Sequence, residues 1–288
     1  MSGPKEPARL PEALAGLGRT AVMAVLNVTP DSFSDGGRYP DVATAVAHGV
    51  AQHAAGADLV DVGGESTRPG AFRVDPREEQ RRVLPVVRGL VAAGVPVSID
   101  TMRAETALAA VDAGACMVND VSGGLADDAM LAAVARLGVP YVVMHWRGPS
   151  DRMATLAHYD DVVSDVCREL SARVEAAEAA GLDPASLVLD PGLGFAKQAE
   201  HNWSLLASLD VLAELGRPLL VGASRKRFLG ELLADATGPR PVGERDAATD
   251  AVSALAAESG VWCVRVHDTL GSLDAVRVAA AWREARRR

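Results

Sequence analysis

Short apolar segments rich in valine recur along the chain, and a stretch of mixed polar and apolar residues follows each one. Eight such segments occur, at residues 21–27, 57–64, 95–100, 116–120, 139–145, 186–190, 217–224 and 261–267. Segments that are apolar almost without interruption are typical of strands buried on both faces, as in a parallel sheet. The pattern therefore predicts eight parallel strands separated by other elements.

The intervening stretches have helical periodicity. An aliphatic residue recurs at every fourth position in residues 159–180 and again in residues 41–55, which predicts one apolar face on each helix. These positions are Val162, Val166, Leu170 and Val174 in the first stretch, and Val42, Val46 and Val50 in the second. Glycines stand where the predicted helices should end, as is usual at helix termini. They are Gly56, Gly94, Gly114, Gly138, Gly181, Gly216 and Gly260.

Eight strand–helix units in 288 residues favour an α/β fold, a (βα)8 TIM barrel in a single domain. The alternative is a doubly wound open sheet, which normally has a glycine-rich turn after its first strand. Here that turn reads NVTPDSFSDGG. No linker, low-complexity tract or sequence repeat divides the chain. We expect a partly flexible N-terminal extension over residues 1–18 and the barrel over residues 19–288.

Composition and charge exclude several classes of protein. Hydrophobic residues make up 49% of the chain, which argues against disorder, and no stretch approaches the ~18 apolar residues that span a bilayer. The net charge of −9 excludes a globally basic surface for nucleic acid, so an anionic ligand needs local cations. The first twenty residues lack the apolar core of a secretory signal, which predicts a cytoplasmic protein. We expect the three widely spaced cysteines to be reduced and buried.

The predicted strands end in polar side chains, and in a barrel these ends form the active face. The polar residues there are Asn27, Asp61, Asp100, Asn119, Asp120, His145, Asp190, Ser224, Arg225, Lys226, Arg265 and His267. Individually they have ordinary explanations, because Asp100 could cap a helix and Asp190 could form a turn. Independent caps would not place a polar group at the end of every strand, so the pattern predicts that these side chains meet at one site.

Arg265 and His267 are two residues apart on the last strand, so their side chains share a face directed toward the barrel mouth. A cation pair after the eighth strand coincides with the usual anion site of such barrels, and arginine suits phosphate recognition. The alternative is a structural Arg265 paired with a helix carboxylate. Two long polar loops, residues 28–40 and 65–75, are interpreted as mobile covers over the site or as ordinary surface loops.

Several familiar kinds of site are missing from the sequence. It contains no phosphate-binding GxxxxGK[ST] loop, no dinucleotide fingerprint, no HxxxH metal spacing and no legible Ser–His–Asp order. A Mg²⁺ ion held by few protein atoms remains an option, because this ion commonly binds mainly through substrate phosphates.

Eight segments together resemble the dihydropteroate synthase family, a group of pterin-binding TIM barrels. They are NVTPDSFSDGG (27–37), DVGGESTRPGA (61–71), SIDT (98–101), NDVSGG (119–124), MHWRG (144–148), DPGLGF (190–195), GASRKRFLG (222–230) and RVHD (265–268). They span almost the whole chain in the family's order and spacing, and the first two are too long for chance agreement. Ala196 stands where many relatives carry glycine, which is a minor departure.

The resemblance implies that 6-hydroxymethyl-7,8-dihydropterin diphosphate and 4-aminobenzoate condense to 7,8-dihydropteroate and diphosphate. It also implies a Mg²⁺ requirement, a homodimer, a role in folate biosynthesis and competition by sulfonamides for the aminobenzoate site. One alternative is a non-catalytic pterin-binding paralogue, against which the intact GESTRPG and MHWRG segments argue. Another is a corrinoid methyltransferase on the same barrel, which has no use for diphosphate-binding cations.

The resemblance further implies a role for each matching residue. The pterin ring would be bound by Asp100, Asn119, Asp190 and Lys226, between the apolar walls Met144 and Phe195. The diphosphate would be bound by Arg265, His267 and Asn27, of which Asn27 would also contact Mg²⁺. The aminobenzoate would be covered by Phe33, Thr67, Arg68 and Pro69, with Ser224 near its carboxylate and Asp35 near its amine. The residues expected to act in catalysis are Asp35, Arg68, Lys226, Arg265 and His267.

Overall fold

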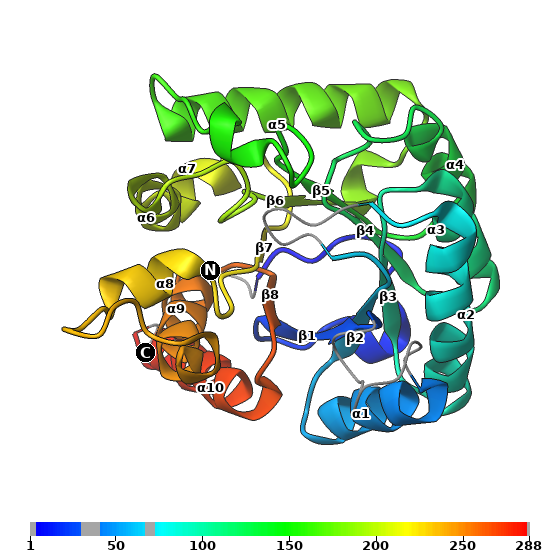
Figure 1. Ribbon diagram of the computed structural model, residues 1–288, viewed down its shortest axis with the longest axis horizontal. Coiled ribbons are helices and arrows are strands. Elements are labelled where there is room, and N and C mark those ends of the chain that lie inside the picture. Colours follow the sequence, from blue (N-terminus) through cyan, green and yellow to red (C-terminus); the bar gives the residue numbers. More distant parts are fainter. Residues whose placement is uncertain (1–3, 30–40, 67–72, 287–288) are drawn as a thin grey trace.

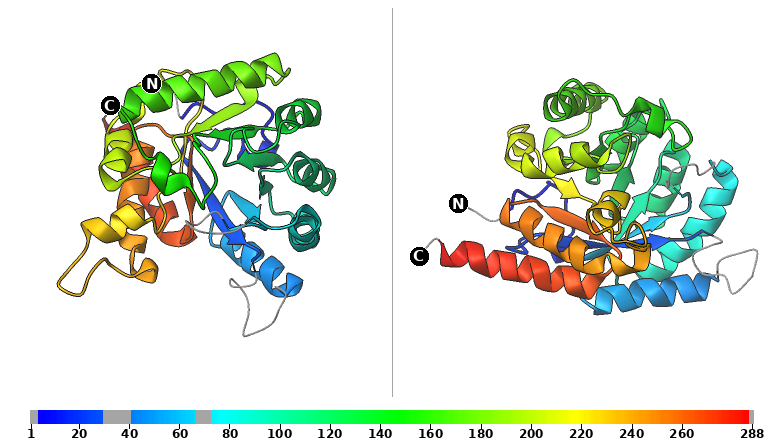
Figure 2. Two further views of the ribbon diagram at one scale, coloured as in Figure 1. Left: turned by 45° about the horizontal axis from the view of Figure 1, so that its top comes forward. Right: turned by 60° about the vertical axis from the view of Figure 1, so that its left-hand side comes forward.

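The computed structural model describes residues 4–29, 41–66 and 73–286. Its eight strands are parallel and form a ring, with the helices around the outside (Figure 1; Figure 2). Neighbouring strands pair in the order β6-β5-β4-β3-β2-β1-β8-β7, and a parallel bridge between Leu189 and Leu219 joins the two ends of that order. The fold is therefore an α/β TIM barrel, as predicted, and not an open doubly wound sheet.

Each strand lies within the apolar segment that predicted it. The strands are β1 (Ala21–Asn27), β2 (Leu59–Gly63), β3 (Val97–Asp100), β4 (Met117–Asp120), β5 (Tyr141–Met144), β6 (Leu187–Asp190), β7 (Leu220–Val221) and β8 (Cys263–Val266). Nearly all of their residues are buried, as expected for strands that are covered on both faces. The segment predicted at 217–224 is the exception in length, because β7 takes up only two of its residues.

The helices follow the strands in turn. They are α1 (Val42–Ala54), α2 (Pro76–Ala92), α3 (Ala104–Asp112), α4 (Met130–Leu137), α5 (Val162–Ala179), α6 (Ala199–Ala207), α7 (Leu209–Ala213), α8 (Arg227–Leu232), α9 (Asp246–Glu258) and α10 (Thr269–Ala285). Asp41, Asp75 and Asp161 cap α1, α2 and α5 by accepting backbone N–H groups of the first turn. The glycines predicted at helix ends all have positive φ, between 66° and 105°. Among the described residues, no helix has both the length and the apolar character needed to cross a membrane.

The predicted apolar face is correct for α5 and only partly correct for α1, where Val46 alone packs against the core. Val42 and Val50 are 37% and 36% exposed, and α1 instead buries Ala45 and Gly49. A Cβ atom on Gly49 would lie 2.6 Å from Leu90 Cδ2 of α2, so the neighbouring helix comes too close for a larger side chain. The face of α1 that packs against the protein core therefore carries small residues. A search for valines and leucines identifies the neighbouring face of the helix instead.

The barrel interior has two layers of different chemistry. The lower layer is apolar and comprises Ala21, Met23, Leu59, Met117, Val142, Val188, Leu220 and Cys263. Leu14, in the short 3-10 helix η1 (Glu12–Leu14), is 1% exposed and packs with this layer together with Trp262. The upper layer lies at the carboxyl ends of the strands and is polar. The N-terminal segment thus contributes to the packed floor beneath the polar layer.

Candidate active site

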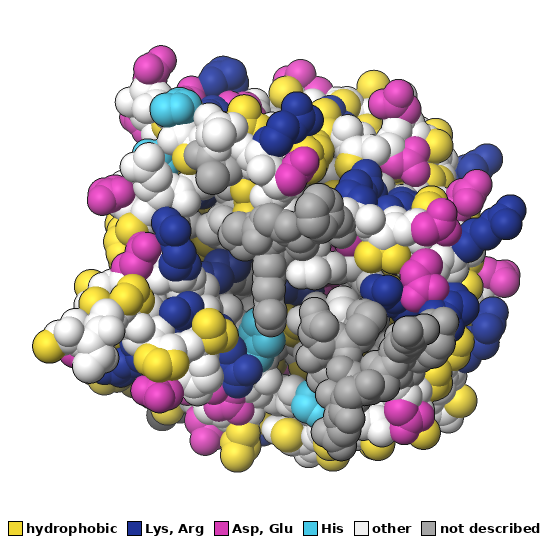
Figure 3. Space-filling view, in the orientation of Figure 1, with side chains coloured by type: hydrophobic (Ala, Val, Ile, Leu, Met, Phe, Trp, Pro, Cys, Tyr) yellow, Lys and Arg dark blue, Asp and Glu magenta, His cyan; other side chains and the backbone are white. Residues whose placement is uncertain are grey.

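The upper layer brings together side chains from five different strands and one following loop. Its members are Asp61 of β2, Asp100 of β3, Asn119 of β4, Asp190 of β6, Arg265 of β8 and Lys226 after β7. In the space-filling view of the same orientation, Lys, Arg and His side chains lie around the central hollow (Figure 3). The predicted convergence of strand-end residues therefore holds for these six. It fails for Asp120, whose carboxylate accepts hydrogen bonds from Ser122 at 2.7 Å and Tyr141 at 2.6 Å instead.

Arg265 is the central cation of this layer. Its Nε donates to Asp61 Oδ2 at 2.7 Å, and its Nη2 donates to Asp100 Oδ2 at 2.8 Å. Asn119 Nδ2 also donates to Asp61 Oδ2, at 2.9 Å. Arg265 is thus paired with carboxylates inside the barrel rather than with a helix carboxylate. Its side chain is 22% exposed and Asp61 is fully buried, so Arg265 lies nearer the barrel mouth.

One guanidinium serves two carboxylates here. Burial raises the pKa of Asp100 to about 7, although the Arg265 charge opposes the shift. Asp61 Oδ1 is buried and has no hydrogen-bond partner among the described residues. Asp100 caps no helix, because α3 begins after Arg103, two residues beyond Thr101. The sequence analysis placed Asp61 among the strand-end residues that should meet but assigned it no individual role, although it lies two residues after the inward-facing Leu59.

Asp190 combines a turn with a place in the polar layer. Its Oδ1 accepts the N–H of Gly192 at 2.7 Å, so the turn interpretation of this residue is also correct. Burial raises the pKa of Asp190, and the nearby Lys226 charge opposes the shift. Lys226 Nζ donates to the carbonyl of Leu193 and lies 4.8 Å from the centre of the Phe195 ring. Burial lowers the pKa of Lys226 to about 8.

Ser224 and His267 lie together on the β7–β8 side of the mouth. Ser224 Oγ is 2.9 Å from His267 Nδ1 and accepts the backbone N–H of His267 at 3.1 Å. Between Ser224 and Lys226, Arg225 has a φ of +57°, and its guanidinium binds both Asp246 oxygens at 2.7 and 2.8 Å. This two-point contact holds a backbone conformation that few side chains adopt. It fixes the directions of the two neighbouring functional residues.

The remaining predicted residues divide into two groups. Asn27 ends β1, and Met144 ends β5 and is buried. Those that fall outside the described residues are Phe33, Asp35, Thr67, Arg68 and Pro69. The interpretation of residues 28–40 and 65–75 as mobile covers therefore stays a prediction.

The residues on either side of 67–72 are joined by a buried ion network. Glu65 accepts the N–H of Val74 at 3.0 Å and a hydrogen bond from Arg103 at 2.8 Å. Arg103 also binds Glu79 at 2.6 Å and the carbonyl of Val74. Arg103, from the next βα unit, thus binds both Glu65 and Val74, which lie on the two sides of residues 67–72.

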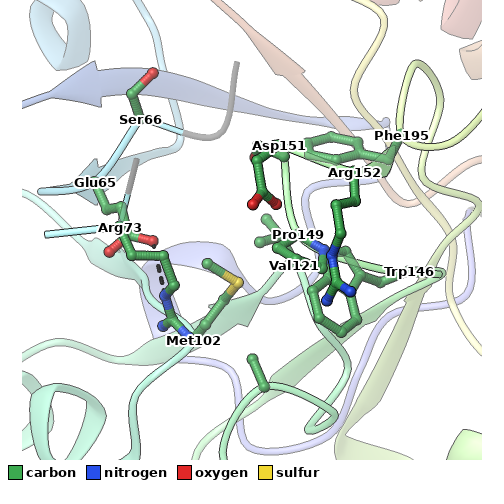
Figure 4. A pocket seen from close by; sticks show the side chains of 12 residues that line it. Glu65, Ser66, Arg73, Met102, Val121, Trp146, Pro149, Asp151, Arg152 and Phe195 are labelled. Atoms are coloured by element: carbon green, nitrogen blue, oxygen red, sulfur yellow. Dashed lines mark hydrogen bonds and ion pairs between the residues drawn. The ribbon is translucent and has the colours of Figure 1, made fainter. Parts of the chain in front are cut away.

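A cavity of about 340 Å³ opens on the same face. Glu65, Arg73 and Met102 line one side, whereas Trp146 and Phe195 lie across from them (Figure 4). Phe195 is the one predicted site residue among its described lining. The lining thus combines apolar side chains with two arginines, Arg73 and Arg152, and two carboxylates, Glu65 and Asp151. The hydrogen-bonding layer lies outside this lining.

The described residues contain no cluster of three or more His, Cys, Asp or Glu side chains that could hold a metal ion. A site built entirely from protein ligands is thus absent from the described part of the chain. An ion that keeps most of its ligands from water and a substrate could still use a single amide oxygen such as that of Asn27.

Comparison with known proteins assigns this geometry to a family. Residues 23–267 match the family described as pterin binding enzyme. The chain belongs to this family. The match begins within β1, covers the other seven strands and ends at the predicted anion residue His267.

Relatives of this pterin-binding enzyme narrow the assignment. Dihydropteroate synthase of Mycobacterium leprae is 58% identical over 266 residues, covering 92% of this chain and 94% of the relative. A structure of Xanthomonas albilineans dihydropteroate synthase with 4-aminobenzoic acid is 47% identical, with a TM-score of 0.87 and coverage of 98% and 99% of the two chains. Another from that organism, in complex with 7,8-dihydropteroate, is 45% identical, with a TM-score of 0.83 and coverage of 96% and 97%. The resemblance drawn from the motifs is confirmed.

Proposed function

We infer that the chain is a dihydropteroate synthase, a transferase of folate biosynthesis. It condenses 6-hydroxymethyl-7,8-dihydropterin diphosphate with 4-aminobenzoate and releases diphosphate. The carrying observation is the convergence of carboxylates, an amide and two cations at the mouth of a barrel whose relatives are named for this reaction. A corrinoid methyltransferase does not explain the near-complete match to the synthases, and turnover separates a synthase from a binding-only paralogue.

We propose that the polar layer reads the pterin ring. A pterin presents an aminopyrimidinone edge rich in N–H donors, which Asp100 and Asp190 would accept. Asn119 offers both a donor and an acceptor, and Lys226 would donate to the ring carbonyl side. Met144 and Phe195 would form the apolar walls. The mixture of buried donors and acceptors supports this role, because a ligand that lacks them would leave polar groups unpaired.

Arg265 and His267 are proposed to hold the diphosphate. Arg265 lies at the end of the eighth strand and His267 directly follows it, where barrels commonly bind phosphate, and Arg265 is the more exposed end of its ion-pair network. Asn27 fits a Mg²⁺ ion that takes its other ligands from phosphate and water. Bound there, Mg²⁺ would neutralise charge on the departing diphosphate.

The residues of the chain then favour loss of the diphosphate first and attack by the amine of 4-aminobenzoate second. The C–O bond breaks, the diphosphate keeps the electron pair, and the cation that remains is delocalised into the electron-rich pterin. Arg265 and His267 stabilise the leaving anion, whereas Asp100 and Asp190 lie next to the developing cation. The amine of 4-aminobenzoate attacks the exocyclic methylene and then releases a proton. Ser224 is proposed to bind the aminobenzoate carboxylate, with Phe33, Asp35, Thr67, Arg68 and Pro69 contributing from segments outside the described residues.

A turnover assay tests the function. The purified protein should form dihydropteroate from the two substrates with Mg²⁺, lose activity on chelation and regain it on re-addition. A sulfonamide should raise the apparent KM for 4-aminobenzoate without changing kcat. Binding of both substrates with no product would contradict the synthase and support a binding-only paralogue.

A homodimer is also part of the proposal. Large apolar side chains are mostly exposed on the adjacent helices α9 and α10, namely Leu255, Leu270, Val278 and Trp282. Apolar groups gathered on neighbouring helices suit a surface that a second copy covers. Trp282→Glu should shift the sedimentation coefficient toward that of a monomer. Val211→Glu, on exposed α7, is the matched control and should leave it unchanged. Identical sedimentation of Trp282→Glu and wild type would exclude this face.

The proposed location is the cytoplasm. All three cysteines are unpaired in the structure, which suits a reducing compartment, but only Cys263 is fully buried as expected.

A further inference from the structure

Lys197 is a buried cation bound by neutral acceptors. Its Nζ donates to the carbonyl of Gly192 at 3.0 Å and to that of Phe195 at 3.1 Å, and it lies 2.9 Å from His145 Nδ1. No ion pair among the described residues includes it. An ammonium group has three protons, and these three acceptors match them one to one.

The two carbonyls belong to the two ends of the turn that leads from β6 toward α6. This turn carries Asp190 before it and Phe195 at its end, both proposed to contact the pterin. Gly192 has a φ of +67°, and a Cβ atom there would lie 2.3 Å from the carbonyl oxygen of His145. The turn therefore packs directly against the end of β5, and the contacts of Lys197 with Gly192, Phe195 and His145 hold it there.

His145 is oriented by its other neighbours. Because Lys197 can only donate, His145 Nδ1 accepts, and Nε2 carries the proton that it donates to Glu169 at 2.9 Å. Burial and the Lys197 charge lower the pKa of His145 to about 4, which keeps the ring neutral. Burial alone would raise the pKa of Glu169, but hydrogen bonds from His145 and Arg147 hold it well below its usual range. A relay thus runs from an ionised carboxylate through a neutral imidazole to the ammonium.

We propose that Lys197 is a positioning residue for pterin recognition, with His145 and Glu169 setting its direction. It holds the Gly192–Phe195 turn in the one conformation that presents Asp190 and Phe195 to the ring. This inference rests on the proposed function, since it assigns Lys197 to the pterin half of the site and not to the aminobenzoate half.

Protonation gives the arrangement a second property. Burial lowers the pKa of Lys197 to about 7, with Asp190 opposing the shift and Lys226 and Arg147 adding to it. His145, Glu169, Tyr159 and His201 are the other titratable groups near it. A neutral amine has only two protons for three acceptors, so one buried acceptor loses its partner. The turn is therefore held most firmly below neutral pH.

Lys197→Met tests the role, because it keeps the unbranched chain up to Cε and removes all three donors. We expect the KM and Kd for the pterin substrate to rise about tenfold or more, while the KM for 4-aminobenzoate stays within about twofold. Arg19→Met is the control, since it removes a part-buried cation bound to Asp58 at the opposite end of the barrel. It should lower the melting temperature and leave both KM values unchanged.

A second pair of variants keeps the test decisive if Lys197→Met folds poorly. His145→Gln preserves an acceptor and a donor, whereas His145→Leu preserves neither. The glutamine variant should retain most of the pterin affinity and the leucine variant should lose it. In wild type, pterin affinity should carry an alkaline decline that Lys197→Arg removes, because arginine stays charged.

Turnover by the wild-type protein tests the proposed function. The ratio of the pterin KM in the variant to that in wild type tests the role of Lys197. Equal changes in the two KM values, or a change in melting temperature alone, would overturn the positioning role. So would equal pterin affinity in the two His145 variants.

Discussion

The lower and upper layers of the barrel interior are built by the same strands but have opposite properties. The pairs of inward residues, two positions apart, are Leu59 and Asp61, Met117 and Asn119, Val188 and Asp190, and Cys263 and Arg265. The lower member of each pair packs against apolar neighbours, whereas the upper member forms hydrogen bonds or ion pairs. Two positions along each strand thus separate a residue that stabilises the fold from a residue of the candidate site.

The difference between the layers lies in how burial acts on them. Burial of the lower layer removes apolar surface from water and stabilises the fold. Burial of the upper layer opposes charge, so the pKa of Asp100 is raised and that of Lys226 is lowered. The packed lower layer, which includes Leu14 and Trp262, offsets the free-energy cost of burying these charged groups above it. Substitutions in the two layers should therefore have separable effects.

The largest effect is expected for Arg265→Met in the upper layer. It removes the cation between Asp61 and Asp100, and with it the proposed diphosphate contact. We expect kcat/KM to fall by roughly a hundredfold to a thousandfold, corresponding to about 3–4 kcal/mol. Steady-state kinetics measures the loss. Binding of the pterin diphosphate should weaken far more than binding of the free pterin alcohol, and equal losses would remove the anion role.

Leu14→Ala tests the lower layer. Removing a fully buried side chain from the floor should reduce the free energy of unfolding by about 2–4 kcal/mol. Urea denaturation measures this change. Both KM values and kcat at 20 °C should match wild type, because no residue of the polar layer contacts the change. A selective loss of substrate affinity would show that the two layers are not separable.

Asp100→Asn sharpens the comparison through pH. Because the pKa of Asp100 is raised to about 7, the folded chain keeps a proton that the unfolded chain releases near pH 4. The contribution of this group to stability therefore falls as pH rises from about 4 to about 7. The contribution of Asp100 to pterin affinity should do the reverse and rise about tenfold between pH 6 and 8, as the acceptor ionises, and it opposes the decline expected from Lys197.

Calorimetric titration of a pterin across this range measures the dependence, and Asp100→Asn should flatten the part due to Asp100. A slope that is unchanged in the variant would assign the titration to another group.

The smallest effect is expected for Ser224→Ala. It removes one hydroxyl that is bonded to His267 and proposed to face the aminobenzoate carboxylate. The KM for 4-aminobenzoate should rise about threefold to tenfold, as one hydrogen bond is worth about 0.5–1.5 kcal/mol. The KM for the pterin substrate is the internal control and should not change.

The barrel and the composition of its polar edge could be predicted because both depend on local pattern. Near-continuous apolar segments identify buried parallel strands, and the ends of parallel strands meet at one edge. The face of α1 was missed because close packing there requires Ala45 and Gly49, which do not stand out as apolar. Sequence periodicity carries no information on how near a neighbouring helix lies.

The partners of the site residues could not be predicted. Arg265 meets Asp61 and Asp100 across separations of 204 and 165 residues, which only the closed ring brings together. Lys197 was missed for another reason, because a lysine that follows a glycine-rich turn reads as a solvated side chain. Its burial depends on His145 and Glu169, which lie on the neighbouring βα unit.

The short β7 has a consequence for the second half of the site. Its ladder with β8 covers only Leu220 and Val221, and a single bridge before it reaches β6. The chain from Gly222 onward is therefore released early from the sheet and turns through the left-handed Arg225, which places Ser224 and Lys226 at the mouth. A longer seventh strand would make the sheet more regular but would draw these residues into the wall. Regular strand pairing and the placement of site residues at the mouth therefore compete for residues 222–226.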